Sequence, residues 1–295
     1  MKKKILVLGV TGMLGWLAYD YLNRIKEFKV TGTIRGKLSG SFKYFEVYDF
    51  LKNEEKYKYI KKFDYIINCI GIIKPFCRDD DPEGVFRAIE VNAVFPHRLA
   101  RFLAGSKTKI IHITTDCVYS GKGGGYEEDA LHNPEDVYGK TKSLGEVNSR
   151  NWLNIRCSVI GLEKSKNVSL LGWFLNQPEG AHLKGFAHHK WNGVTALQYA
   201  ELCQSIIDKN SFNKIRKISH VHHYIPNKAV NKYELLQIIA DVFGKKYVIE
   251  KVEDTANPVD RSLGTKISIL KPVNRISVEE ALKELKNYMT DNHFL

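Results

Sequence analysis

Hydrophobic and polar residues along the first half of the chain follow a pattern that switches repeatedly between strand and helix. Short apolar runs predict buried parallel strands at Ile5–Leu8, Lys29–Ile34, Tyr65–Asn68, Lys109–Thr114 and Asn154–Val159. Segments with helical spacing predict helices over Leu14–Asn23, Pro82–Leu103 and Tyr138–Asn148. Such alternation predicts an α/β fold built on a doubly wound parallel sheet.

The second half of the chain has a more mixed pattern. Amphipathic helices are expected over Ala196–Ile207 and Lys232–Val242, and another strand over Lys217–Val221. Ser277, three residues before Glu280, has the spacing of a capping box and predicts the start of the last helix.

A glycine cluster follows the first predicted strand and opens the first predicted helix. Gly9, Gly12 and Gly15 have the spacing G-x-x-G-x-x-G, which differs from the G-x-G-x-x-G of the dehydrogenase fingerprint. Glycines there permit a tight turn and let a pyrophosphate approach the free N–H groups of the helix N-terminus. Because the cluster lies between a strand and a helix, it predicts a dinucleotide-binding loop, with plain turn glycines as the alternative.

Tyr138 and Lys142 are the strongest candidates for chemistry. They are four residues apart, so on a helix they share one face. A free tyrosine is a poor acid–base group at neutral pH, but a nearby ammonium and a nicotinamide cation should lower its pKa. Thr115, at the end of a predicted strand, supplies a hydroxyl that would hold the carbonyl oxygen. Such a set can pass a proton to a ketone while a hydride arrives from a cofactor.

Together these motifs resemble the extended short-chain dehydrogenase/reductase family. Within it the chain is most similar to the dTDP-4-dehydrorhamnose reductase branch, whose members reduce 4-keto sugars carried on a nucleoside diphosphate. The resemblance is strong over residues 1 to about 160 and diffuse beyond. The segments that carry it are Gly9–Gly15, Asp49-Phe50, Asn68–Gly71, Val91–Ala93, Thr114–Tyr119, Tyr138–Lys142, Trp191–Thr195 and Pro258–Leu263.

The resemblance implies a two-part organisation. Residues 1–160 would form a Rossmann-type NADP-binding domain, with 191–223 returning to it. Residues 161–190 and 224–295 would form a smaller, interleaved C-terminal substrate lobe.

The resemblance also implies a nicotinamide cofactor. The residues expected to bind it are Gly9, Thr11, Gly12, Met13, Leu14, Gly15, Arg35, Asp49, Phe50, Cys69, Ile70, Gly71, Tyr138 and Lys142. Arg35 follows the second predicted strand, where NAD enzymes usually carry an acidic residue and where arginine suits a 2′-phosphate. Thr33 and Lys37 add a hydroxyl and a cation, so NADPH is predicted, with NADH possible. Asp49 resembles the family's aspartate beside the adenine; an ordinary strand-end aspartate is the alternative.

Catalytic roles follow from the resemblance for Thr115, Tyr138 and Lys142. The expected substrate contacts are Lys74, Asp116, Cys117, Trp191, Asn192 and Arg261. An arginine fork matches phosphate geometry, although Trp191, Asn192 and Arg261 could equally be structural. Asn92 resembles an asparagine near the family's active site.

Cys117 departs from the pattern of related enzymes. In nucleotide-sugar 4,6-dehydratases a glutamate stands at this place, so dehydration would lack its base here. GDP-fucose synthase, an epimerase-reductase, has cysteine there, but its partner histidine has no counterpart within Leu162–Phe174. A simple reductase is therefore favoured over an epimerase or dehydratase. A non-catalytic NADP-sensing protein is a further alternative, although sensing needs no proton donor.

The charge and the cysteine and histidine content limit which partners and metal sites are expected. The net charge of +12 comes from scattered lysines without a block of five or six, which suits an anionic substrate and argues against nucleic acid. The five cysteines lack C-x-x-C spacing and indicate free thiols in a reducing cytoplasm. No metal site is expected at His188-His189 or His222-His223, because neighbouring side chains should point apart.

The expected cellular setting is the cytoplasm. No segment is apolar over the length that a membrane span needs, and the apolar run after Lys2–Lys4 is too short for a signal peptide. The resemblance implies a role in surface-polysaccharide precursor synthesis, with a homodimer as a possibility.

Overall fold

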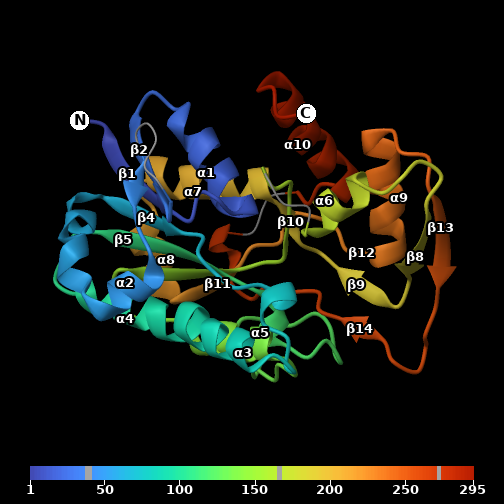
Figure 1. The fold of residues 1–295 in the computed structure, drawn as a ribbon, viewed down its shortest axis with the longest axis horizontal. Helices are drawn as coiled ribbons and strands as arrows, with labels where there is room; N and C mark the ends of the chain where they lie inside the picture. Colours follow the sequence, from blue (N-terminus) through green and yellow to red (C-terminus); the bar gives the residue numbers. More distant parts are fainter. Residues whose placement is uncertain (37–41, 165–167, 271–273) are drawn as a thin grey trace.

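The computed structural model describes residues 1–36, 42–164, 168–270 and 274–295, and a large parallel sheet dominates it (Figure 1). Seven described strands pair in the order β11-β6-β5-β4-β1-β2-β3, all in parallel. Their bounds are β1 Lys3–Leu8, β2 Phe28–Ile34, β3 Lys43–Tyr44, β4 Tyr65–Asn68, β5 Lys109–Thr114, β6 Trp152–Arg156 and β11 Val221–His223. This architecture confirms the predicted doubly wound Rossmann-type sheet.

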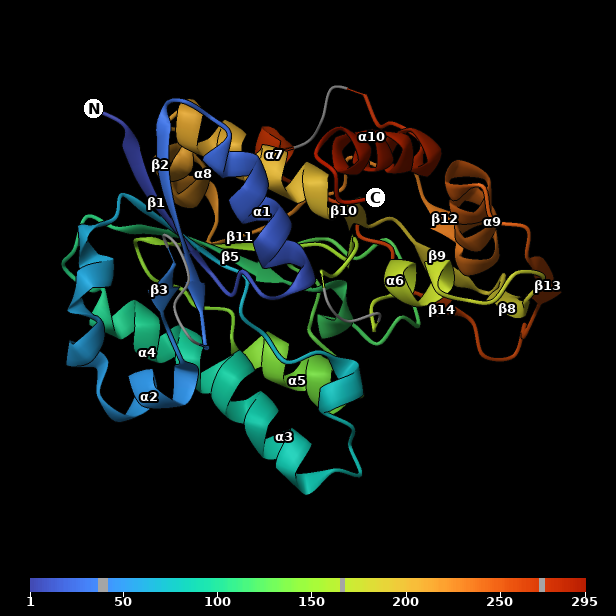
Figure 2. The ribbon, with the colours of Figure 1, turned by 45° about the horizontal axis from the view of Figure 1, so that its top comes forward.

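Helices cover both faces of the sheet (Figure 2). One face carries α1 (Met13–Asn23), α7 (Ala196–Asp208) and α8 (Phe212–Ile218), and the other carries α2 (Val47–Lys52), α4 (Phe95–Phe102) and their neighbours. Because successive side chains of a strand point to opposite faces, Ile5 and Val7 enter one core, whereas Leu6 and Leu8 enter the other. The apolar strand runs predicted from the sequence are thus buried on both sides.

Three predicted elements differ in detail from the structure. The helix predicted over Pro82–Leu103 is present as α3 (Pro82–Ala88), a π-helical turn (Ile89–Val94) and α4. The tyrosine helix, α5, spans Val137–Leu144 and ends earlier than predicted. The strand predicted over Lys217–Val221 is wrong, because buried Phe212 and Ile215 continue helix α8 to Ile218, and strand β11 begins only at Val221.

The remaining elements gather beyond one end of the large sheet, on the right of Figure 1. The strands there are β7 Val159–Ile160, β8 His182–Phe186, β9 His189–Trp191, β10 Val194–Thr195, β12 Val230–Asn231, β13 Val248–Val252 and β14 Val259–Asp260. The helices are α6 Leu170–Leu175, α9 Lys232–Phe243 and α10 Val278–Asp291. Short 3₁₀ turns elsewhere cover Glu54–Lys62, Lys74–Phe76, Asp116–Val118 and Ser268–Leu270.

The last helix links the end of the chain to the first. Helix α10 begins with the capping box expected at Ser277 and Glu280. The Tyr288 hydroxyl donates a hydrogen bond to the Asp20 carboxylate of α1 at 2.7 Å, and Phe294 packs edge-on against Trp16.

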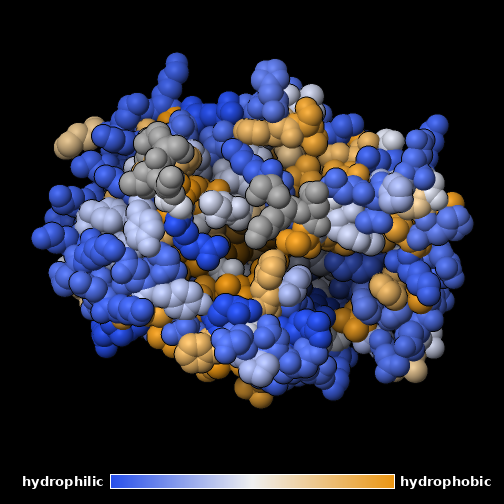
Figure 3. Space-filling view, in the orientation of Figure 1, coloured by the Kyte–Doolittle hydropathy of each residue, from blue (hydrophilic) through white to orange (hydrophobic). Residues whose placement is uncertain are grey.

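The face drawn in Figure 3 is largely hydrophilic, with apolar side chains around a central hollow. No helix in the described ranges has both the length and the apolar character needed to cross a bilayer.

Candidate active site

The loop between β1 and α1 is shaped for close approach of a phosphate. Gly9 has a φ of 85°, and its N–H donates to the Thr33 hydroxyl at 3.1 Å. A Cβ on Gly15 would lie 2.2 Å from the Gly9 carbonyl oxygen, so only glycine fits there. Gly12 caps α1 without a side-chain hydrogen bond, and a Cβ there would meet only that carbonyl, at 3.6 Å. The helix N-terminus is therefore open to an anion, as a dinucleotide pyrophosphate requires.

The loop lies at the point where the strand order reverses. Strands β1 and β4 are neighbours, and in such sheets ligands bind between the loops that follow the two diverging strands. Ile70, just after β4, lies against Gly9, where a Cβ would stand 3.0 Å from the Ile70 side chain. Its N–H donates to the Asn68 side chain at 3.2 Å. The structure thus brings the predicted Cys69–Gly71 segment beside the glycine loop.

The other residues expected to bind the cofactor differ in how exposed they are. Thr11 is exposed at the loop, Met13 packs near Gly161, and Leu14 is buried in the core. Arg35 is exposed just after β2, where a 2′-phosphate could reach it. Lys37 lies outside the described residues.

Asp49 corrects one alternative of the sequence analysis, and both Asp49 and Phe50 use their side chains within the protein. Asp49 lies inside α2 and not at a strand end, and its carboxylate pairs with Lys56 and accepts a hydrogen bond from the Tyr57 hydroxyl at 2.8 Å. The Phe50 ring is fully buried and packs edge-on against aromatic rings, including that of Phe95. Because its side chain fills the core, Phe50 offers no ring surface to a cofactor.

Helix α5 positions the tyrosine–lysine pair. The Asp136 carboxylate caps it by accepting a hydrogen bond from the Gly139 N–H at 2.7 Å. Lys142 is buried, and its Nζ donates to the Ile113 carbonyl of β5 at 2.8 Å. Burial lowers the pKa of Lys142 to about 8, with the Glu146 carboxylate opposing that shift. Lys142 is therefore still charged at neutral pH.

Burial acts on the pKa of Tyr138 against the lowering that we expect from Lys142 and a nicotinamide cation. Burial raises the pKa of its phenol above the ordinary value, and nearby Cys117 and Asp116 act in the same direction. A hydrogen bond with the Thr115 side chain opposes this rise only in part. Before a nicotinamide cation binds, Tyr138 therefore keeps its proton at neutral pH. A protonated phenol is the form that a proton donor needs.

The turn after β5 carries Thr115 to the tyrosine. The Thr115 hydroxyl accepts a hydrogen bond from the Cys117 N–H at 3.1 Å and donates to the Asp116 carboxylate at 3.0 Å. A Cβ built on Gly139 would lie 2.2 Å from the Cys117 carbonyl oxygen, so turn and helix meet backbone to backbone. Thr115 and Tyr138 are thereby brought together as predicted.

Asn92 connects two parts of the site. It lies in the π-helical turn, a rare conformation that is frequent at functional sites. Its amide accepts a hydrogen bond from the Ile72 N–H at 2.8 Å and donates to the Ile72 carbonyl at 2.9 Å. It also donates to the Thr141 hydroxyl at 3.2 Å. Asn92 therefore fastens the loop after β4 to helix α5.

Lys74 and Cys117 lie near Tyr138, and the charge of Arg261 acts on both of them. The Lys74 ammonium lies 5.9 Å from the centre of the Tyr138 ring and forms an ion pair with Asp136 at 2.6 Å. Burial raises the pKa of Cys117 to about 12, against the opposing charges of Lys74 and Arg261. Cys117 is therefore a neutral thiol at physiological pH.

Residues from the C-terminal part approach the same place. The side-chain amide of Asn192 donates a hydrogen bond to the Leu263 carbonyl at 2.8 Å and accepts one from the Leu263 N–H at 3.0 Å. Asn192 therefore has a structural role. Trp191 is buried in β9, and the Lys232 ammonium lies 5.4 Å from its ring centre. The charge of Lys232 acts on Asp116 and Cys117. Sequence reasoning missed Lys232, because a lysine that opens an amphipathic helix carries no functional signal of its own.

The paired histidines do not form a metal site. Within the described part of the chain, no group of three or more His, Cys, Asp or Glu side chains is arranged to hold a metal ion. The ring of His222 bonds to the Ile215 carbonyl at 3.1 Å, and that of His223 to the Gly264 carbonyl at 2.7 Å. The rings of His188 and His189 lie 4.4 Å apart and edge-on, so they do not point apart as expected.

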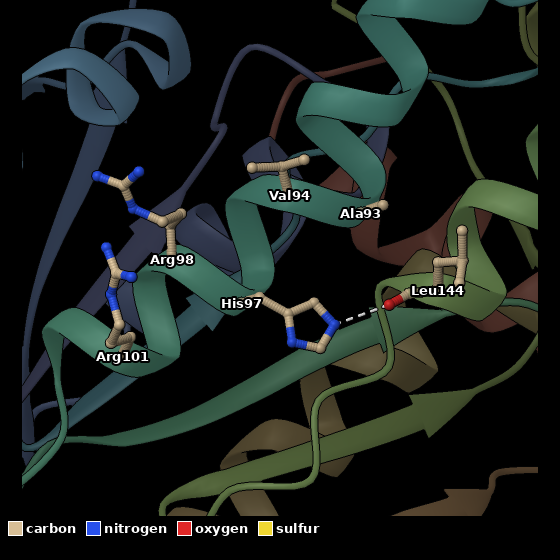
Figure 4. A pocket seen from close by; sticks show the side chains of 6 residues that line it. All are labelled: Ala93, Val94, His97, Arg98, Arg101 and Leu144. Atoms are coloured by element: carbon tan, nitrogen blue, oxygen red, sulfur yellow. Dashed lines mark hydrogen bonds between the residues drawn. The ribbon is translucent and has the colours of Figure 1, made fainter.

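A separate surface pocket of about 450 Å³ lies beside α4 and the end of α5 (Figure 4). The His97 ring bonds to the Leu144 carbonyl across it at 2.8 Å, and apolar Ala93 and Val94 line it. None of the predicted catalytic residues lines this pocket.

The parallel sheet, the glycine loop and the grouping of Thr115, Tyr138 and Lys142 define an extended short-chain dehydrogenase/reductase fold. The chain belongs to the RmlD substrate binding domain family, whose sequence profile matches residues 2–271.

Three relatives illustrate the range of similarity. Methionine adenosyltransferase 2 subunit beta of Xenopus tropicalis is 26% identical over 253 residues, which cover 82% of this chain and 72% of that protein. The dTDP-4-dehydrorhamnose reductase of Mycolicibacterium smegmatis is 36% identical over 91 residues, 30% of this chain and 27% of that one. The structure of dTDP-4-dehydrorhamnose reductase from Bacillus anthracis in complex with NADP aligns with a TM-score of 0.79 at 18% identity. That alignment covers 98% of this chain and 100% of the other.

Proposed function

We propose that this protein is an NADPH-dependent reductase of a 4-keto-6-deoxy sugar attached to a nucleoside diphosphate. The observation that supports the proposal is that the Thr115 side chain hydrogen-bonds with Tyr138 and that Tyr138 and Lys142 lie one turn apart on helix α5. A protonated phenol that hydrogen-bonds with the Thr115 side chain, with Lys142 one helical turn further along α5, would donate a proton to a carbonyl oxygen.

The residues of the loop and its surroundings fit a dinucleotide. The open N-terminus of α1 would receive the pyrophosphate, and the exposed guanidinium of Arg35 would hold a 2′-phosphate. When bound, the nicotinamide cofactor supplies the hydride. The NADP in the Bacillus anthracis structure supports NADPH here, and NADH is the less favoured alternative.

The proton follows a short path in this proposal. Thr115 orients the carbonyl of the substrate, and Tyr138 transfers its phenolic proton to the carbonyl oxygen as that oxygen gains negative charge. The positive charge of Lys142 would stabilise the phenolate left behind, and Lys142 would also hold the cofactor ribose. Each of the three side chains thus has a distinct task.

A second candidate is a non-catalytic NADP-binding subunit. The similarity to methionine adenosyltransferase 2 subunit beta, over 82% of the chain, favours it. The intact set of Thr115, Tyr138 and Lys142 favours the reductase, because binding alone needs no proton donor. An epimerase or dehydratase is less favoured, because Cys117 replaces the dehydratase glutamate and burial keeps its thiol neutral.

NADPH oxidation with a panel of dTDP-, UDP- and GDP-linked 4-keto-6-deoxy sugars tests the proposal. We expect oxidation with at least one of them, and a product reduced at C4 by NMR. Tight NADPH binding without oxidation by any sugar would instead support the subunit. A role in surface-polysaccharide precursor synthesis, a cytoplasmic location and a homodimer stay predictions.

A further inference from the structure

A pocket of about 930 Å³ lies at the edge of the large sheet where its strands begin, on the side of the N-terminus in Figure 1. Three of the residues that line it, Lys3, Tyr65 and Lys109, are the first residues of β1, β4 and β5. The glycine loop and Thr115 instead follow the last residues of β1 and β5. Because these strands are parallel, the pocket and the candidate active site lie at opposite edges of the sheet.

Cations from separate parts of the chain gather around this pocket. The six that line it are Lys3, Lys107, Lys109, Arg150, Arg216 and Lys217. Asp64 is the one carboxylate among the described residues of the lining, and it accepts a hydrogen bond from the Lys4 N–H at 2.8 Å. Lysines that are scattered in the sequence are thus brought together by the fold, and we call this place the basic pocket.

Lys109 is half-buried, and its charge is only partly balanced. Burial lowers the pKa of its ammonium and the charge of Lys3 lowers it further, whereas the Asp64 carboxylate opposes both. The ammonium donates to the Asn210 side-chain oxygen at 3.4 Å and lies 5.3 Å from the centre of the Tyr65 ring. It forms no ion pair with a described residue. An ammonium has three donors, so Lys109 keeps hydrogen-bonding capacity for an incoming anion.

Arg216, on helix α8, is a second half-buried cation of the basic pocket. Burial lowers the pKa of its guanidinium. The guanidinium donates to the Ser149 carbonyl at 3.0 Å and to the Asn148 side chain at 2.5 Å, and both of these acceptors are uncharged. A cleft lined by one sign of charge concentrates ions of the other sign. An anion in the pocket would therefore stabilise both Lys109 and Arg216.

The size and the lining of the basic pocket favour a small polyanion. Ligand pockets in proteins span roughly 300–1,000 Å³, a range that includes this one. Tyr65 is the one aromatic residue of the described lining, and only 1% of it is exposed. No ring surface is thus available there for stacking on a base, as single-stranded nucleic acids require. Recognition would rest on charge.

We propose that the basic pocket binds a small polyphosphate group, either free or as the phosphate chain of a nucleotide. Lys109 and Arg216 would be its central contacts, because ammonium and guanidinium groups bind phosphate oxygens by charge-assisted hydrogen bonds. This site is independent of the proposed reductase, since it lies at the opposite edge of the sheet.

Calorimetric titration of the full chain with sodium tripolyphosphate and with ATP tests the site. Lys109→Met should weaken the binding of both probes about tenfold or more, as expected for loss of a charged hydrogen bond. Lys217→Met removes an exposed cation of the pocket and should weaken binding about threefold. Equal affinity for the two probes would identify the phosphate chain as the ligand, and tighter binding of ATP would identify a nucleotide.

Lys214→Met is the matched control for Lys217→Met. It makes the same charge change at an exposed position of α8 that is not part of the pocket lining, so it should bind both probes like the wild type. Because Lys217 is exposed, its variant also tests the site if Lys109→Met does not fold.

Three results would refute the site. They are failure of the wild type to bind either probe, normal binding by both Lys109→Met and Lys217→Met, and equal weakening by Lys214→Met and Lys217→Met. A probe bound only at the glycine loop would give the second of these results. Binding of a short DNA duplex, but of neither small probe, would replace the proposed site with a nucleic-acid surface.

Discussion

Gly139 and Cys117 fix the distance between the two halves of the proposed catalytic site. A Cβ on Gly139 would lie 2.2 Å from the Cys117 carbonyl oxygen, well inside any tolerated contact. The helix that carries Tyr138 therefore rests directly on the turn that carries Thr115.

Gly139→Ala should push that helix away from the turn. We expect a loss of about 1–3 kcal/mol in the free energy of unfolding, as for other overpacked sites, and a fall in kcat. Chemical denaturation and turnover measure the two effects. Lys140→Ala changes the exposed neighbour on the same helix and should alter neither. Wild-type stability and kcat in Gly139→Ala would show that the backbone contact is unimportant.

Arg35→Asp should shift the cofactor preference from NADPH towards NADH. The change removes a cation and places a carboxylate where the 2′-phosphate is expected, so the ratio of kcat/KM values should fall about tenfold or more. Lys29→Asp, an equal charge change at an exposed site earlier on β2, should leave the ratio unchanged. If Arg35→Asp also leaves it unchanged, Arg35 does not contact the 2′-phosphate.

A substitution at Cys117 distinguishes a reductase from an epimerase. A reductase uses it only as a wall of the cleft, so Cys117→Ser should keep appreciable activity and give the same product. Burial raises the pKa of this thiol to about 12, which does not suit a group that must ionise. Turnover in heavy water should place no deuterium at C3 or C5 beyond the non-enzymatic background. Enzyme-dependent incorporation that disappears in Cys117→Ser would establish an epimerase instead.

Glu201 makes the stability of the protein depend on pH. Burial, and then the charge of Glu284, raise the pKa of Glu201 from 4.5 to about 7. The folded state therefore holds this proton more tightly than the unfolded state, so the contribution is favourable below pH 4.5 and is lost as pH rises to about 7. Glu201→Gln cannot ionise, so its melting temperature should exceed that of the wild type more at pH 8 than at pH 5. A pH-independent difference would show that Glu201 does not titrate in this way.

Local patterns predicted most of the sheet, and the candidate catalytic residues were also identified from local patterns. The strand of Ile5–Leu8, the glycine loop and the Tyr138–Lys142 spacing are encoded in short segments, so they could be read without tertiary information. The strand predicted over Lys217–Val221 was wrong because a helical and a strand pattern compete in short segments, and burial of Phe212 and Ile215 favours the helix.

The features that the sequence did not predict depend on contacts between residues far apart in the chain. The direction of the pKa shift of Tyr138 depends on how much the fold shields the phenol from water. The sequence spacing, in contrast, indicates only that a lysine lies nearby. Lys232 lies beside the Trp191 ring because three distant strands pair in one register, which no local pattern predicts. The packing of the Phe50 ring in the aromatic core also depends on such contacts, and the role of this residue at the cofactor stays a prediction.

The turnover of Tyr138→Phe tests the central claim most directly. This variant removes the phenolic proton and leaves the ring, so NADPH binding measured by titration should stay nearly unchanged. NADPH oxidation with the best keto sugar should fall by roughly 100-fold to 10,000-fold, the usual effect of losing a general acid. Retention of most of the wild-type kcat would contradict the account, because the proton would then come from a group other than Tyr138.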